Sequence, residues 1–190
     1  MSGRYCFIKK MNLKMFLVVI LCFVFAGCSY SGTPPKKLDI QKLLKNGNFE
    51  HWFHGKNLPP DCWRFRTSGG GIVVRESKEK LINSYSVSLR RGTSYIDLWQ
   101  NIPVKYLKGK TVTFSCWAKC NNATGARLRI NDGIGASYSL CHTGRGDWEL
   151  LTVTRTIDDR ATSVILTLYV DTDSVIAYFD DAKLVEEGGH

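Results

Sequence analysis

Several segments with alternating apolar and polar residues carry aromatic and basic side chains on the face turned away from the expected core. The side chains with this placement are Trp117, Arg127, Arg129, Asn131 and Tyr169. Exposed aromatic rings offer apolar platforms, and guanidinium and amide groups donate hydrogen bonds in fixed directions. If the strands that carry them share one sheet, these residues form an aromatic and basic ligand-binding face.

Trp99 is a sixth candidate whose orientation the sequence leaves open. Trp99 and Gln100 are neighbours in one alternating segment, so that one of the two faces the core and the other faces away from it. Trp52 and Tyr138 are reserve candidates. For Trp117, cover by a loop is an alternative to ligand binding, and outward arginines are often simply solvated.

The histidines and paired carboxylates do not form a recognisable catalytic pattern. His51 and His54 are three residues apart, in a segment where no helix is expected to place them on one face. Asp158 and Asp159 resemble the paired carboxylates of a glycosidase, but they lie in a turn-like segment. We therefore expect that the protein is not an enzyme.

The composition is that of one globular domain without a nucleic-acid footprint. The chain has 190 residues, with 26 Lys and Arg against 17 Asp and Glu, and a formal net charge of +9. Four of the basic residues precede the first apolar run, and no later basic run exceeds a dipeptide. Binding to nucleic acid would need a clustered basic surface, so we expect no nucleic-acid partner.

The elements that position the candidate residues are short strands. Alternating or apolar runs occupy residues 72–75, 85–90, 94–104, 111–119, 126–131, 137–142, 148–157, 163–171 and 177–185. Turn residues separate them, and the one helix expected is a short one near residues 39–44. The pattern predicts an all-β fold, a β-sandwich of two antiparallel sheets over residues 38–190.

The N-terminal segment reads as an export signal. A basic stretch precedes an apolar run at residues 15–26, which is too short to span a bilayer comfortably. The run ends in a sequence that resembles the lipobox of bacterial lipoproteins, which implies acylation of Cys28 after removal of residues 1–27. Residues 28–37 are small, polar and proline-containing and are expected to be a tether. We expect an exported protein that is lipid-anchored in the bacterial cell envelope.

Export would permit disulfide bonds among the four cysteines of the domain. These are Cys62, Cys116, Cys120 and Cys141. Their spacing fits no zinc motif, and the three possible pairings stay open beside the alternative of free, buried thiols.

Four segments in order resemble one protein family. They are residues 43–50 with Trp63 following, 99–119, 146–154 and 178–185. The combination is similar to the carbohydrate-binding modules attached to xylanases and cellulases, within the galactose-binding-like jelly rolls. The resemblance implies a jelly-roll β-sandwich that binds glycans without cleaving them, and it places Trp63 and Trp148 in the core.

The resemblance also implies a structural calcium ion. In the family, carboxylates from the first and last strands hold the metal, and the matching positions are Glu50 and Asp180 or Asp181. Calcium binds hard oxygen ligands, so these residue types suit it.

Two functions therefore stand as hypotheses. The first is polysaccharide binding by a membrane-anchored, non-catalytic module, whose arginine-rich face would suit an acidic glycan or another charged polymer. The alternative is a structural or adhesive cell-envelope protein that uses the jelly roll to contact a protein partner.

Overall fold

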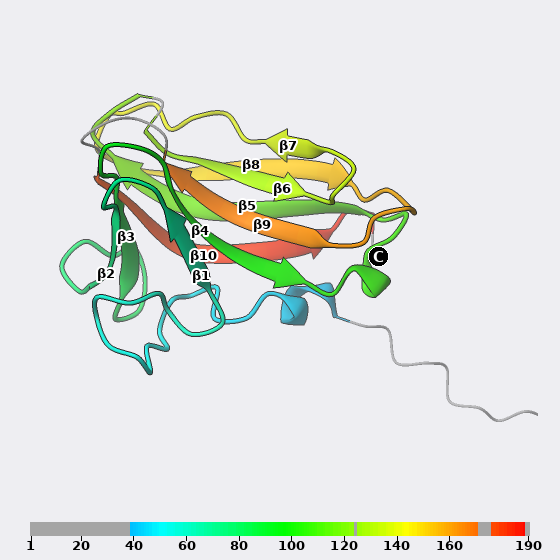
Figure 1. Ribbon diagram of the computed structural model, residues 1–190, viewed down its shortest axis with the longest axis horizontal. Coiled ribbons are helices and arrows are strands. Elements are labelled where there is room, and N and C mark those ends of the chain that lie inside the picture. Colours follow the sequence, from blue (N-terminus) through cyan, green and yellow to red (C-terminus); the bar gives the residue numbers. More distant parts are fainter. Residues whose placement is uncertain (1–38, 124, 171–175, 189–190) are drawn as a thin grey trace, which may run out of the picture. The chain divides into compact units, whose positions relative to one another are not determined.

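Two five-stranded antiparallel sheets make up the fold in the computed structural model, which describes residues 39–123, 125–170 and 176–188. Sheet A has the strand order β1-β4-β9-β6-β7, and sheet B has the order β2-β3-β10-β5-β8. The two sheets are stacked (Figure 1). This arrangement confirms the expected all-β sandwich of two antiparallel sheets.

Most element bounds follow the alternating segments of the sequence, but the strand expected at residues 137–142 is shorter and ends at Tyr138. The strands of sheet A are β1 (Arg64–Thr67), β4 (Ile96–Ile102), β9 (Val164–Val170), β6 (Arg127–Asn131) and β7 (Ala136–Tyr138). Those of sheet B are β2 (Ile72–Glu76), β3 (Ser86–Arg90), β10 (Ile176–Glu186), β5 (Thr111–Cys120) and β8 (Trp148–Thr156). The expected short helix is a 3-10 helix, η1 (Ile40–Leu43), and a second one is η2 (Val104–Tyr106). Strand β1 was not predicted, because its four residues, RFRT, carry no apolar alternation.

Alternation along each strand determines which side chains reach the core. β5 buries every second residue from Val112 to Cys120 and leaves the residues between them partly exposed. In β9, Leu166 and Leu168 are fully buried, as the sequence predicts. The buried side chains of both sheets join in one hydrophobic cluster, whose burial drives folding.

The segment before β1 contributes aromatic side chains to this core. Phe49 is fully buried, and its ring centroid lies 5.4 Å from that of Trp63, which is 4% exposed. Trp63 is thus in the core, as expected. Trp52 is also buried, and its indole Nε1 donates to the Phe49 carbonyl, which removes it as a reserve ligand residue.

Gln100 faces the core and so settles the orientation of Trp99. Its side-chain amide accepts from the Lys45 amide at 2.7 Å and donates to the Lys45 carbonyl at 2.9 Å. These two bonds satisfy a side chain that is only 4% exposed, as a buried polar group requires. Trp99 therefore lies on the outer side of β4.

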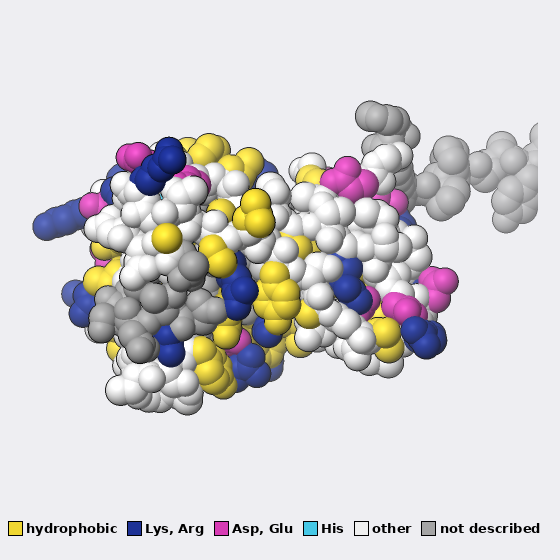
Figure 2. Space-filling model, turned by 90° about the horizontal axis from the view of Figure 1, so that it is seen from above, with side chains coloured by type: hydrophobic (Ala, Val, Ile, Leu, Met, Phe, Trp, Pro, Cys, Tyr) yellow, Lys and Arg dark blue, Asp and Glu magenta, His cyan; other side chains and the backbone are white. Residues whose placement is uncertain are grey.

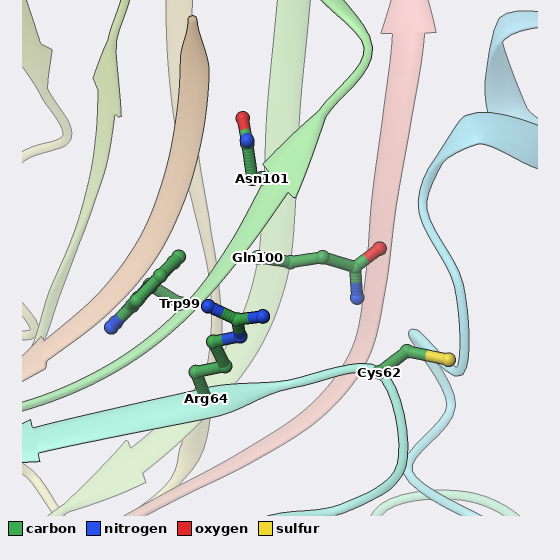
Figure 3. Close-up of a pocket in the computed structure, with 5 residues that line it drawn as sticks. All are labelled: Cys62, Arg64, Trp99, Gln100 and Asn101. Atoms are coloured by element: carbon green, nitrogen blue, oxygen red, sulfur yellow. The ribbon is translucent and has the colours of Figure 1, made fainter.

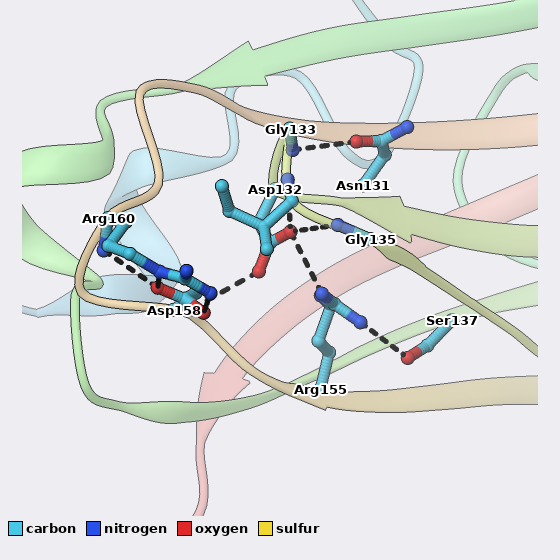
Figure 4. A network of polar contacts seen from close by, with 9 residues as sticks. Asn131, Asp132, Gly133, Gly135, Ser137, Arg155, Asp158 and Arg160 are labelled. Atoms are coloured by element: carbon cyan, nitrogen blue, oxygen red, sulfur yellow. Dashed lines mark hydrogen bonds and ion pairs between the residues drawn. The ribbon is translucent and has the colours of Figure 1, made fainter.

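A buried ion pair ties the end of β6 in sheet A to β8 in sheet B (Figure 4). Asp132, fully buried, accepts from Arg155 Nη2 at 2.9 Å, from the amides of Ile134 and Gly135, and from the amide of Asp158. Burial alone would raise the pKa of Asp132, but these donors, Arg155 foremost, hold the pKa well below its usual value.

The four cysteines that the structure describes are free thiols. Cys116 and Cys120 lie on the buried side of β5, as their equal parity predicts, while Cys62 is exposed. Burial raises the pKa of the Cys116 thiol well above its ordinary value, so this thiol is an unreactive core group.

The expected signal sequence, lipidation site Cys28 and tether at 28–37 lie outside the described residues. Within the described ranges, no helix is long and apolar enough to cross a membrane.

Candidate functional site

The outer face of sheet A carries three rows of side chains that run across its strands. The central row consists of the register partners Arg64, Trp99, Thr167, Arg129 and Tyr138. The row on one side consists of Arg66, Asp97, Tyr169 and Arg127. The row on the other side consists of Asn101, Ile165, Asn131 and Ala136. The rows thus bring rings, guanidinium groups and amides to one side of sheet A, where Asp97 and Thr167 are fully buried.

Guanidinium groups and aromatic rings are stacked along this surface. The Arg64 guanidinium carbon lies 5.6 Å from the centroid of the Trp99 ring. That of Arg127 lies 4.9 Å from the Tyr138 ring and 5.3 Å from the Tyr169 ring. Such cation–π contacts hold the long arginine side chains against the sheet.

Asp97 forms ion pairs with two of the arginines, Arg66 and Arg129. It is fully buried, and its Oδ2 lies 2.6 Å from Arg66 Nη2 and 3.7 Å from Arg129 Nη2. Arg129 Nη2 also donates to Thr167 Oγ1 at 3.3 Å. The hydrogen bond to Asp97 raises the pKa of Arg66, so that its guanidinium stays charged. Asp97 Oδ1 is buried and has no hydrogen-bond partner among the described residues.

Two hollows meet at Trp99. One, of about 240 Å³, is lined by Cys62, Arg64, Trp99, Gln100 and Asn101 (Figure 3). Figure 3 shows Trp99 and Gln100 on opposite sides of β4, with the Arg64 side chain reaching toward the indole. The other hollow, of about 210 Å³, is lined by Arg66, Trp99, Arg129, Asn131 and Ile165. The indole of Trp99 therefore borders both hollows, and polar donors surround it.

Figure 2 shows the molecule from above, so that the side with β7 and β8 at the top of Figure 1 faces the reader. Lys and Arg side chains are interspersed with hydrophobic ones over the part of the surface drawn there. This surface therefore combines basic and hydrophobic side chains, as the outer face of sheet A does.

The structure brings together five of the six residues that the sequence singled out as ligand-binding. Trp99, Arg127, Arg129, Asn131 and Tyr169 all lie on the outer face of sheet A, together with the reserve candidate Tyr138. Thr167, expected to point outward beside Tyr169, lies on the same side of β9, whereas Arg64, Arg66 and Asp97 were missed as site residues. The four residues of β1, RFRT, contain a single apolar residue, Phe65, and so gave no signal for a strand.

Trp117 does not belong to this face. It lies on β5 in sheet B, where its register partners are Leu150 and Asp180. The condition that its strand shares a sheet with residues 126–131 is not met, so the assignment of Trp117 to this face is wrong: β5 pairs with β8 and β10, and the chain changes sheet before β6. Trp148, expected in the core, is only partly buried and pairs with Lys119 on the outer side of the same sheet.

The carboxylates expected to hold calcium contact protein donors instead. Glu50 Oε1 accepts from the amides of Ser84 and Tyr85, at 3.1 and 2.9 Å. Asp180 Oδ2 accepts from the amides of residues 81 and 82, and its Oδ1 accepts from the Asp181 amide.

Asp181 itself pairs with Lys183, so all three carboxylates face N–H groups. Because Glu50 Oε1, both oxygens of Asp180 and Asp181 Oδ2 already accept hydrogen bonds, a calcium ion bound through these oxygens would compete with their present donors. Among the described residues, no three His, Cys, Asp or Glu side chains cluster as metal ligands. The calcium site stays a prediction from the family resemblance.

Another histidine of the chain, His142, is bound by its own loop. Its Nε2 lies 3.0 Å from the Asp147 carbonyl, and its Nδ1 accepts from the Gly144 amide at 2.8 Å. Asp158 binds the Arg160 guanidinium within its own turn.

Comparison with known proteins shows similarity at the level of the fold. No protein-family model matches the chain, and no curated protein matches its sequence. Among solved structures, TmCBM61 in complex with β-1,4-galactotriose is similar with a TM-score of 0.56 and 21% identity, over 76% of this chain and 98% of that one. The CBM22-1 xylan-binding domain of Paenibacillus barcinonensis Xyn10C has a TM-score of 0.55 and 14% identity, over 69% of this chain and 89% of that one.

A third similar structure is the enzymatically active domain of bacteriophage CBA120 tailspike protein 4. Its TM-score is 0.55 and its identity 16%, and the match covers 76% of this chain but only 21% of that one. Several of the similar structures are carbohydrate-binding modules. The sandwich thus has the jelly-roll form of these modules, and at such identities the likeness concerns the fold.

Proposed function

We propose that the protein is a non-catalytic carbohydrate-binding module whose outer face of sheet A binds a polysaccharide. The observation that carries the proposal is the position of Trp99, whose indole borders two hollows lined by arginine and asparagine side chains. Sugar rings have apolar C–H faces and dense hydroxyl groups, which suit an aromatic platform ringed by hydrogen-bonding groups. The solved neighbours described with galactotriose and as xylan-binding support the assignment by analogy of fold.

Trp99→Ala tests this proposal against a matched control in the same molecule. Trp99 and Trp117 are partly buried tryptophans on the outer sides of the two different sheets. Loss of a central aromatic contact costs about 2 kcal/mol of binding free energy, which corresponds to roughly thirtyfold in affinity. We expect this loss for Trp99→Ala and unchanged affinity for Trp117→Ala, measured by affinity electrophoresis in a panel of soluble polysaccharides.

The melting temperatures of both variants separate binding from folding. Lost binding with a native-like melting temperature in Trp99→Ala supports the proposal. Equal loss in both variants, or no retention of the wild-type protein by any glycan, contradicts it. In the second case, capture of a cell-envelope protein partner would favour the structural or adhesive function.

We further propose that the module is exported and lipid-anchored in a bacterial cell envelope through Cys28. The support is the sequence alone: an apolar run at residues 15–26 that ends in small residues before this cysteine. Cys28→Ala should abolish incorporation of radiolabelled palmitate and move the protein from the membrane to the soluble fraction. Palmitate labelling that persists in this variant would rule out Cys28 as the anchor.

A further inference from the structure

We propose that the polysaccharide bound by sheet A is anionic, and that its carboxylate or sulfate groups bind Arg64, Arg66 and Arg129. The inference rests on the proposed function and names the chemical class of its ligand. It follows from the charge balance of the face, the way its arginines are held, and their position around Trp99.

The outer face of sheet A has an excess of positive charge. Its three rows include four arginines, Arg64, Arg66, Arg127 and Arg129, and within the described strands one carboxylate, Asp97. Asp97 is fully buried, so it compensates charge from beneath and presents no carboxylate to a ligand. No acidic side chain lines either hollow beside Trp99.

Each hollow contains at least one guanidinium group. Arg64 lines the first, where its described contact is the stacking on Trp99. Arg66 and Arg129 line the second and share a single oxygen atom, Asp97 Oδ2, as their described acidic partner. Two guanidinium groups with one shared carboxylate leave a net positive charge directed at this hollow.

The arginines are held in place before any ligand arrives. The described hydrogen bonds of Arg66 and Arg129 engage Nη2 of each group, with Asp97 or Thr167 as acceptors. Arg66 also lies 5.5 Å from the Tyr95 ring, and Arg129 lies 5.9 Å from the Tyr169 ring. A guanidinium group has five N–H donors in a planar fork that matches carboxylate and sulfate geometry, so a fixed guanidinium binds such a group with little loss of entropy.

The spacing of the charges suits a polymer better than a small anion. Arg64 and Arg66 are alternate residues of β1, which places their Cα atoms about 7 Å apart on the same side of the strand. They line different hollows, and Trp99 lines both. A chain of sugars stacked on Trp99 would therefore meet a cation on each side of the ring.

The test measures binding of the full-length protein to polygalacturonate, to κ-carrageenan, and to the neutral polymers galactan and xylan. The carboxylate and sulfate polymers distinguish the two kinds of anionic group. At 50 mM NaCl we expect at least one anionic polymer to bind about tenfold more tightly than either neutral one, and the difference to shrink at 500 mM NaCl as charges are screened.

Charge-neutral variants locate the effect. Arg64→Gln and Arg66→Gln should each weaken binding of the anionic polymer about fivefold to tenfold, as loss of a charge-assisted hydrogen bond predicts. Arg90→Gln is the matched control, because Arg90 is an exposed arginine at the end of β3 in sheet B. It should change the affinity by less than twofold.

The outcomes separate this inference from the proposed function. If neutral glycans bind through Trp99 as tightly as anionic ones and Arg64→Gln has no effect, the anionic class is wrong and glycan binding stands. If Trp99→Ala leaves binding of anionic polymers intact, or single-stranded DNA binds as well as they do, the attraction is a nonspecific charge effect and the inference is overturned. If no polymer binds, both proposals fail.

Discussion

Replacing Asp132 with Asn should destabilise the protein strongly, because Asp132 is the buried acceptor that ties the two sheets. Its Oδ1 accepts from Arg155 Nη2 and Gly135 N, each at 2.9 Å, and from Ile134 N at 3.0 Å, while Oδ2 accepts from Asp158 N at 3.2 Å. Asparagine keeps the shape of the side chain but replaces one acceptor oxygen with an NH₂ group. Arg155, whose side chain is 17% exposed, would then lack a described carboxylate partner.

The expected magnitude follows from this geometry. Breaking a buried ion pair by removing one partner costs about 3–5 kcal/mol of unfolding free energy, and the partial exposure of Arg155 favours the lower end. At roughly 2–4 °C per kcal/mol for a chain of this size, a loss of about 3 kcal/mol lowers the melting temperature by roughly 6–12 °C. Calorimetry or circular dichroism at pH 7 measures this shift.

The control is Asp158→Asn, an Asp→Asn substitution at a second aspartate of the same polar network. Asp158 is bound by Arg160, whose side chain is 75% exposed, so Asp158→Asn should shift the melting temperature only slightly. If the two variants melt together, the buried pair does not tie the sheets and our reasoning is refuted.

The pH dependence provides a second, independent readout. The pKa of Asp132 is lowered on folding, so the stability it contributes is complete above the unfolded pKa of about 4 and is lost as the pH falls toward the folded value. Wild-type protein should therefore lose its advantage over Asp132→Asn progressively below about pH 4. An advantage that stays constant down to pH 2 would contradict the assigned shift.

Two further predictions concern the core and the metal. Gln100→Ala should lower the unfolding free energy by about 1–3 kcal/mol, because it leaves the Lys45 amide and carbonyl without their partner. Asn101→Ala, on the exposed side of the same strand, should change the unfolding free energy little, and urea unfolding of both variants measures the difference. Oxygens of Glu50 and Asp180 accept backbone N–H groups, so the melting temperatures in EDTA and in millimolar CaCl₂ should agree within about 1 °C. A melting temperature that rises with calcium concentration would contradict this prediction and support the calcium site expected from the family resemblance.

Most of the fold was predictable because alternation is a local signal. In β5 and β9, the period-two alternation of apolar residues is enough to identify the buried side of the strand. The signal failed where a strand is short and polar, as in β1, since RFRT offers no buried alternation to detect. It also failed for Trp148, because an aromatic residue at a family position does not determine which side of the strand faces the core.

The candidate site was predictable only in part, because alternation assigns a side chain to a side of its strand and says nothing about which sheet contains the strand. Trp117 and Arg129 have the same local pattern, yet β5 lies in sheet B and β6 in sheet A. That assignment depends on long-range pairing between strands distant in sequence, such as β4 with β9. The same pairing brings Asp97 beneath Arg66 and Arg129, which come from β1 and β6. The contacts that fix the guanidinium groups, and with them the charge of the proposed binding face, thus arise only from the tertiary structure.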